Sequence, residues 1–231
     1  MINAGLKIDY SDFATYELSV LKQYYQKFIK EIDFLTKRIK ANPYNIINKK
    51  DEQLKDRNLH KLGDKKPFQE LNGFYSLNVD KTHRLIWDIL YDTAHDDNYK
   101  LQDINNLDFS EDVRTNLWGK ISNAIDGCKA DRLIFVYILN VFFDDHADFD
   151  PNPAACSIDY LLHEDGIEIN PNSPFMNTKY SILKYDEYQK KIDEGNLDIL
   201  DDSVKKNLNT DTRYPHLQHI LDYKNEHPEL F

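Results

Sequence analysis

The chain has 231 residues, of which 41% are hydrophobic, and its formal net charge is −11 at pH 7. This length suits one core with an appended part. Seven Gly and eight Pro residues exclude a low-complexity protein, and no apolar run approaches the ~20 residues of a membrane span. The first residues lack the pattern of a signal peptide, and Cys128 and Cys156 lack metal-type spacing. We therefore expect a cytoplasmic protein with no membrane partner.

The charge is unevenly distributed along the chain. Residues 1–90 hold 16 Lys and Arg against 12 Asp and Glu, whereas residues 91–231 hold 13 against 28. Such an asymmetry predicts two functional regions. The basic N-terminal part can approach a phosphate backbone. The acidic C-terminal part is repelled by nucleic acid, and it suits either a basic partner or a basic surface of its own chain.

The first predicted elements are a strand and a long helix. Residues 5–10 read as a short opening strand. Across residues 12–41 apolar side chains recur at steps of three and four, which predicts one amphipathic helix. Ser11 or Asp12 can cap its start. Pro43 disfavours the helical conformation at the residue before it, so the helix is expected to end there.

A polar connection, a hairpin, an insertion and a buried strand follow. Residues 44–66 are lysine-rich and read as a link with room for a short helical turn. Two alternating stretches around a polar turn make residues 71–90 a β-hairpin. Residues 91–130 look like an insertion that contains a helix near 110–127. Residues 133–143 are the most apolar run, which predicts a central strand buried on both faces.

The chain changes character after Pro153. The acidic part that follows contains candidate helices at 157–163, 185–194 and 215–226. Its apolar residues are too few for it to fold alone, so we expect it to pack on the first part.

One segment carries a more specific pattern. Residues 66–89, KPFQELNGFYSLNVDKTHRLIWDI, resemble the hairpin of the RelE/YoeB superfamily of bacterial toxins, which includes the ParE-like branch. The residues that match without a gap are Leu71, Gly73, Phe74, Tyr75, Ser76, His83, Arg84, Leu85, Ile86 and Trp87. Residues 34–45 resemble the end of the family's helical segment, and residues 133–149 resemble its last strand. The resemblance covers roughly residues 5–90 and 131–150.

The resemblance implies an α+β fold, with a RelE-like twisted antiparallel sheet and N-terminal helices on one face, plus a mainly helical C-terminal extension. We expect a RelE-like domain at 1–153, with an insertion at about 91–130, and an acidic extension at 154–231 packed on it. The implied function is a toxin of a toxin–antitoxin system that cleaves mRNA on the ribosome, where the 2′-OH attacks the adjacent phosphate. Its implied partners are the mRNA and an antitoxin protein, and this chemistry needs neither a metal nor a cofactor.

Arg84 and His146 are the first candidate catalytic residues. The resemblance places Arg84 on the scissile phosphate, which guanidinium suits by bidentate geometry. The alternative is a strand-end Arg that pairs with Glu70 or Asp88. His146 follows the last strand, where several nuclease members keep a catalytic His or Tyr, and its reference pKa of ~6.5 suits acid–base work. Its acidic neighbours favour a second reading, an acidic exit loop.

Lys65 and Lys66 are the remaining candidates. Nuclease members often carry a Lys or Glu there, but a solvated lysine pair is the alternative. His83 alternates to the face opposite Arg84, where a structural role is expected. The chain departs from the family at Leu77-Asn78, where nuclease members usually place an Arg.

Three functions remain open from the sequence. The first is an enlarged RelE/YoeB-type endoribonuclease whose acidic extension shields its basic face. The second is a catalytically inactive relative that uses the same sheet to bind a protein. The third is a ParE-like inhibitor of a nucleic-acid enzyme such as gyrase, which a single long N-terminal helix favours over a helical pair.

Overall fold

The computed structural model describes residues 4–62, 73–94, 111–144, 157–178 and 181–183, with Lys190 and Glu194. The chain divides into two compact units, residues 1–143 and 144–231. The boundary expected after residue 153 and the packing of the extension on the first part stay predictions.

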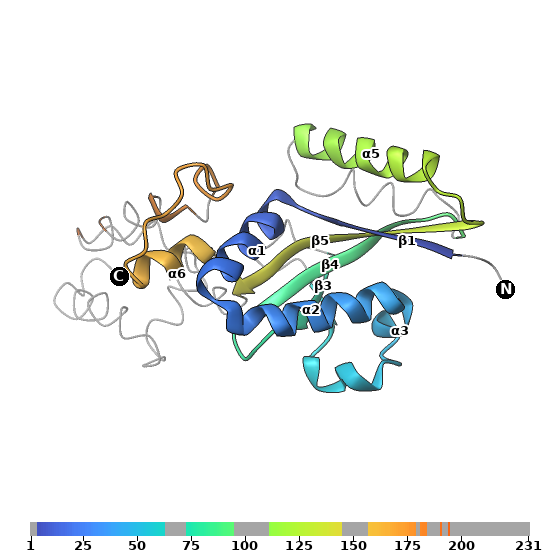
Figure 1. Cartoon of the computed structure of the whole chain (residues 1–231), viewed down its shortest axis with the longest axis horizontal. Coiled ribbons are helices and arrows are strands. Elements are labelled where there is room, and N and C mark those ends of the chain that lie inside the picture. Colours follow the sequence, from blue (N-terminus) through green and yellow to red (C-terminus); the bar gives the residue numbers. More distant parts are fainter. Residues whose placement is uncertain are drawn as a thin grey trace, which may run out of the picture. The chain divides into compact units, whose positions relative to one another are not determined.

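The first unit contains a five-stranded sheet and several helices (Figure 1). In chain order the elements are β1 (Ala4–Tyr10), α1 (Asp12–Tyr24), α2 (Gln26–Ala41), α3 (Pro43–Ile47), the 3-10 helix η1 (Glu52–Arg57), β2 (His60–Lys61), β3 (Tyr75–Asn78), β4 (His83–Asp92), α5 (Glu111–Asp126) and β5 (Arg132–Asp144). In the second unit the described residues form α6 (Ile158–Glu164). The protein is therefore a mixed α+β protein, as the sequence predicts.

The strand order across the sheet is β1-β5-β4-β3-β2. Strands β2, β3 and β4 pair antiparallel, and Asn78 lies opposite Arg84 in the hairpin. The amide of Thr93, just after β4, donates to the Leu133 carbonyl near the start of β5, so these two strands run in opposite directions. Strand β1 pairs parallel with β5. The prediction of an antiparallel sheet is therefore wrong for this one pair.

The long helix predicted over residues 12–41 is two helices. Tyr25 interrupts it with φ −129° and ψ 48°, and this residue caps the end of α1 and the start of α2. The local sequence contains neither Gly nor Pro, so it carries no breaker signal. The break lets each helix turn its own apolar face to the sheet, with Val20 and Leu21 buried on α1 and Leu35 buried on α2.

Local signals set the other ends of these helices. The Ser11 side chain accepts from the Ala14 amide at 2.9 Å, which caps α1 as predicted. Asn42 is extended, with φ −165° and ψ 94°, directly before Pro43, so α2 ends where the proline predicts.

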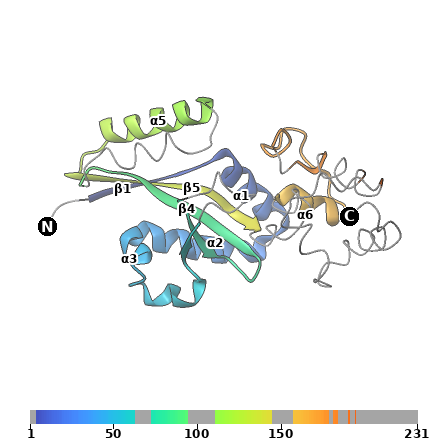
Figure 2. The same cartoon turned by 180° about the vertical axis from the view of Figure 1, so that it is seen from behind.

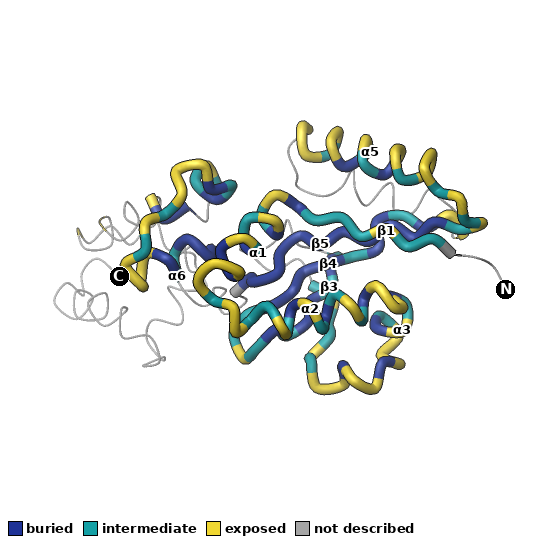
Figure 3. The backbone as a smooth tube through the Cα atoms, in the orientation of Figure 1, coloured by how far each residue is buried: buried dark blue, intermediate teal, exposed yellow. Residues whose placement is uncertain are grey.

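The central strands are buried on both faces, as Figure 3 shows along β4 and β5. Both Ile86 and Trp87 on β4, and both Phe135 and Val136 on β5, are fully buried although consecutive side chains point to opposite faces. Helices α2 and α3 lie on one side of the sheet, and α5 lies on the opposite side in both views (Figures 1 and 2). The sheet is therefore covered by helices on both sides.

The predicted helices at 110–127 and 157–163 are confirmed as α5 and α6. In the second unit, Ile158, Leu162 and Phe175 are buried. The predicted helix at 215–226, and most of the one at 185–194, lie outside the described residues. Within the described ranges, no helix has the length and apolar character needed to cross a lipid bilayer.

Candidate functional site at the β3–β4 hairpin

The turn that joins β3 to β4 is organised around Asp80. Its carboxylate accepts from the amides of Thr82 at 2.8 Å and His83 at 2.6 Å, and from the His83 ring at 2.9 Å. Burial raises the pKa of Asp80, but these hydrogen bonds outweigh that effect and hold the pKa below its usual range. The polar turn predicted from the sequence is therefore held by several hydrogen bonds to one carboxylate.

Substitution of Asp80 tests this organisation. Asp80→Ala is expected to destabilise the protein by ~1–2 kcal/mol, because two backbone amides lose their acceptor. Asp80→Asn keeps an acceptor for those amides and is expected to cost less. A carboxylate whose pKa is lowered on folding stabilises above its unfolded pKa, so the difference between wild type and Asp80→Asn should shrink as the pH falls below ~4. Urea unfolding at several pH values measures both effects, and equal stability of Asp80→Ala and wild type would contradict them.

Arg84 lies directly after this turn and is 5% exposed. Its Nη1 donates to the carbonyls of His83 at 3.1 Å and Asp80 at 3.3 Å, and its Nη2 donates to the Lys81 carbonyl at 3.3 Å. The guanidinium therefore holds the turn of its own hairpin. Its expected contact with a scissile phosphate stays a prediction, and so does the alternative pairing with Glu70 or Asp88, of which Glu70 lies outside the described residues.

A second arginine holds the same turn. Arg57, at the end of η1, donates from Nη1 to the Val79 carbonyl at 3.1 Å and forms an ion pair with Glu31 of α2. The carbonyls of four turn residues thus receive guanidinium donors from two separate segments. Sequence reasoning missed Arg57, because nothing in the lysine-rich link distinguishes it from its neighbours.

Two polar side chains of β3 share the strand face of Arg84. Asn78 lies opposite Arg84, and Ser76 is two residues before Asn78 on the same strand. In the described part of the chain, Ser76 Oγ and Asn78 Oδ1 are buried and have no hydrogen-bond partner. A buried polar atom without a partner costs ~1–3 kcal/mol, so each such atom calls for a physical explanation. We refer to Ser76, Asn78 and Arg84 together as the Arg84 face.

His83 serves the opposite side of the sheet. Its ring stacks on Phe142 at 3.7 Å between centroids and meets Phe28 of α2 edge-on at 5.8 Å. This aromatic cluster fixes the start of β4 against β5 and α2, in agreement with the structural role expected from alternation.

The structure does not test the other candidate residues. Lys65, Lys66 and His146 lie outside the described residues, so whether they approach Arg84 stays a prediction. Among the residues that are described, no group of three or more His, Cys, Asp and Glu side chains is placed to hold a metal ion. Comparison with known proteins adds no relative: no family model, no curated protein and no solved structure matches the chain.

Proposed function

We propose that the chain is a toxin of a toxin–antitoxin system that cleaves mRNA on the ribosome, in the manner of the RelE/YoeB superfamily. The observation that carries the proposal is the Arg84 face, because it combines a guanidinium with two buried polar atoms that lack partners. The gapless hairpin pattern at 71–87 and the helices α1 and α2 beside the sheet also support it.

The proposed chemistry uses the chain's own side chains. The guanidinium of Arg84 stabilises the charge that develops on the phosphate when the 2′-OH attacks it. To do so, it exchanges turn carbonyls for phosphate oxygens, and the charge-assisted bonds to phosphate are the stronger ones. His146, Lys65 and Lys66 are the proposed acid and base groups.

Substitution of Arg84 tests the proposal. Arg84→Ala is expected to lower the rate of mRNA cleavage on translating ribosomes by roughly 100-fold or more, because one well-placed cation is worth ~3 kcal/mol of barrier. Primer extension on a translated message measures cleavage, and growth of cells that express the protein measures toxicity. Wild-type protein that leaves the message intact would remove the nuclease proposal.

Arg57→Met is the matched control, because Arg57 also holds the turn but lies outside the Arg84 face. It is expected to lower stability and to leave the cleavage rate within a few-fold of wild type. Equal losses of cleavage in the two variants would mean that Arg84 acts through the turn alone.

One observation favours a second candidate function, a catalytically inactive relative that binds a protein. Arg84 is 5% exposed and its donors are engaged by carbonyls of its own turn, which suits a structural role. This candidate predicts intact mRNA together with a stable protein complex in pull-down, and neither should change in Arg84→Lys. The gyrase-inhibitor hypothesis loses its specific support, because the long helix that favoured it is divided at Tyr25.

A further inference from the structure

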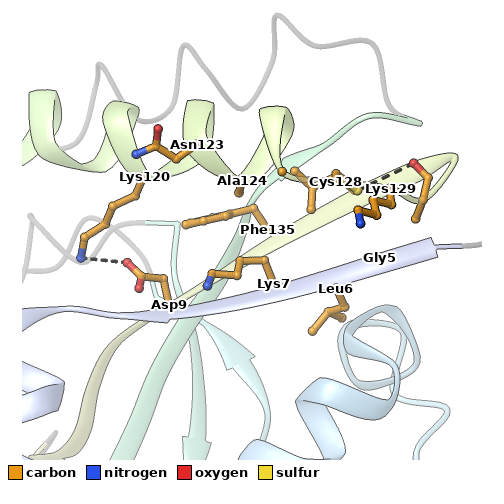
Figure 4. Close-up of a pocket in the computed structure, with 13 residues that line it drawn as sticks. Gly5, Leu6, Lys7, Asp9, Lys120, Asn123, Ala124, Cys128, Lys129 and Phe135 are labelled. Atoms are coloured by element: carbon orange, nitrogen blue, oxygen red, sulfur yellow. Dashed lines mark hydrogen bonds and ion pairs between the residues drawn. The ribbon is translucent and has the colours of Figure 1, made fainter.

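A cavity of about 660 Å³ lies between α5 and the strands β1 and β5 (Figure 4). Its walls come from the start of β1, from β5 and from the second half of α5 with the turn that follows it. Leu133 and Phe135 of β5 line the bottom of the cavity, and both are buried, at 4% and 0% exposed. This volume falls within the ~300–1,000 Å³ of small-molecule sites.

Three lysines from separate segments line this cavity: Lys7 on β1, Lys120 on α5 and Lys129 in the turn after α5. Among the described residues that line the cavity, the one carboxylate is that of Asp9, which forms an ion pair with Lys120 at 2.8 Å between Nζ and Oδ2. The described residues of the lining therefore carry a net charge of +2, in a chain whose net charge is −11. Lys7 and Lys129 are exposed, so their ammonium groups are accessible to a ligand.

Contacts at both ends hold the walls of the cavity. At one end, Gly5 packs so closely against the turn after α5 that an added Cβ would lie 3.2 Å from Cys128 Sγ and 3.3 Å from Ala130 Cβ. At the other end the Lys120–Asp9 pair bridges α5 and β1, as the dashed line in Figure 4 marks. Between these contacts the helix and the sheet leave the space open.

We propose that this cavity binds a phosphorylated small molecule of nucleotide size. Lysine ammonium groups suit phosphate as mobile point charges. Apolar lining from Ala124, Ala130 and Phe135 receives the uncharged part of the ligand. The site lies apart from the Arg84 face, and the proposal does not depend on mRNA cleavage.

Isothermal titration of the full chain with adenosine monophosphate, pyrophosphate and citrate tests the ligand class. Adenosine monophosphate is expected to bind more tightly than pyrophosphate, because it also fills the apolar part of the cavity. Citrate, a carboxylate of similar charge, is expected to bind at least tenfold more weakly than adenosine monophosphate. Equal binding of citrate and adenosine monophosphate, or no heat with any phosphate compound, would overturn the proposal.

Four variants locate the binding. Lys7→Met and Lys129→Met are each expected to weaken adenosine monophosphate binding by about fivefold, as loss of one exposed charge pair does. Lys37→Met removes an exposed lysine on α2 and is expected to change nothing. Ala124→Trp fills the cavity from α5 and is expected to abolish binding while the thermal unfolding temperature stays near that of wild type.

Asp9→Asn separates this proposal from a purely structural role of the lysines. Its carboxylate opposes an anionic ligand and engages Lys120. Its removal is expected to tighten adenosine monophosphate binding by several-fold, even though it costs an ion pair. Weaker binding in Asp9→Asn, or full binding in Ala124→Trp, would place the ligand elsewhere and overturn the proposal.

Discussion

Replacing Glu17 by Gln is expected to stabilise the protein by roughly 3–4 kcal/mol at pH 8.5 and by about 1 kcal/mol at pH 5. Glu17 of α1 is 0% exposed, and its carboxyl accepts from the Asn140 amide at 2.9 Å and from the backbone amides of Val141 and Phe142 at 2.6 and 3.2 Å. Burial raises the pKa of Glu17 to about 7, although the three hydrogen bonds oppose that rise. The folded protein therefore holds a proton that the unfolded chain releases near its ordinary pKa.

The sign of the pH dependence follows from that raised pKa. The contribution of Glu17 to stability is fully present below the unfolded pKa of ~4.3 and is lost as the pH rises towards about 7. Stability should fall by at most ~1.4 kcal/mol per pH unit in this window. In Glu17→Gln one amide oxygen can accept both backbone amides, and its NH₂ can donate to a flipped Asn140, so the slope should disappear.

Urea unfolding at pH 5, 7 and 8.5 measures this effect. Glu52→Gln is the control, because the Glu52 side chain is 74% exposed, and it should keep the wild-type slope. Glu17→Ala is expected to be less stable than wild type by ~2–4 kcal/mol, since three donors lose their acceptor. Parallel pH profiles for wild type and Glu17→Gln would show that the carboxyl titrates normally.

Removal of the Asp92 carboxylate is the second substitution expected to change the stability of the protein strongly. Asp92 ends β4, and its side chain is 1% exposed. Arg132, at the start of β5, donates to it in a bidentate arrangement with Nε–Oδ1 at 2.8 Å, and the Tyr44 hydroxyl of α3 donates to Oδ2. Asp92→Ala is expected to cost ~3 kcal/mol, towards the low end for a buried pair, because the Arg132 side chain is 25% exposed and water can reach it.

Lowering the pH should cause part of the same loss of stability in the wild-type protein. Burial alone would raise the pKa of Asp92, but the bonds from Arg132 and Tyr44 lower it to about 2. A depressed carboxyl pKa means that the stabilisation is present above ~4 and is lost as the pH falls towards 2. Tyr44→Phe removes only the hydroxyl and is expected to cost ~1 kcal/mol.

Hydrogen exchange distinguishes local from global effects of Asp92→Ala. Thr93, directly after β4, and Leu133, near the start of β5, hydrogen-bond to each other next to the Asp92–Arg132 pair. Their amides should exchange faster in Asp92→Ala than those of Ile86 and Phe135 in the core. Uniform acceleration at all four amides would mean that the cluster supports the whole sheet instead.

The spacing of apolar residues predicts those helices and strands whose buried face is set by their own sequence. The apolar run at 133–143 and the alternation around residues 71–90 became β5 and the β3–β4 hairpin, and Ser11 and Pro43 marked helix ends. The parallel pairing of β1 with β5 joins residues 128 positions apart, as Ala4 and Arg132 are, and no local signal encodes that choice. The break at Tyr25 also arises from packing, since both halves have good helical sequence.

The candidate site was less predictable than the fold. The sequence singled out Arg84 as a residue of interest, but the turn carbonyls that hold its guanidinium depend on how residues 79–83 fold. Glu17 sits in an ordinary helical pattern, and only the approach of β5 makes it a buried acceptor. Lys7 is far in the sequence from Lys120 and Lys129, and it meets them only because α5 folds over β1.

The parallel β1–β5 pair has a consequence for synthesis on the ribosome. Strand β1 is made first, yet its partner begins at Arg132, so at ~5–20 residues per second it waits roughly 6–25 seconds for its neighbour. Meanwhile β1 exposes an unpaired edge of the kind that invites association between nascent chains. Slower translation upstream of residue 132 should therefore lower the soluble yield, whereas a chaperone that shields extended segments should restore it.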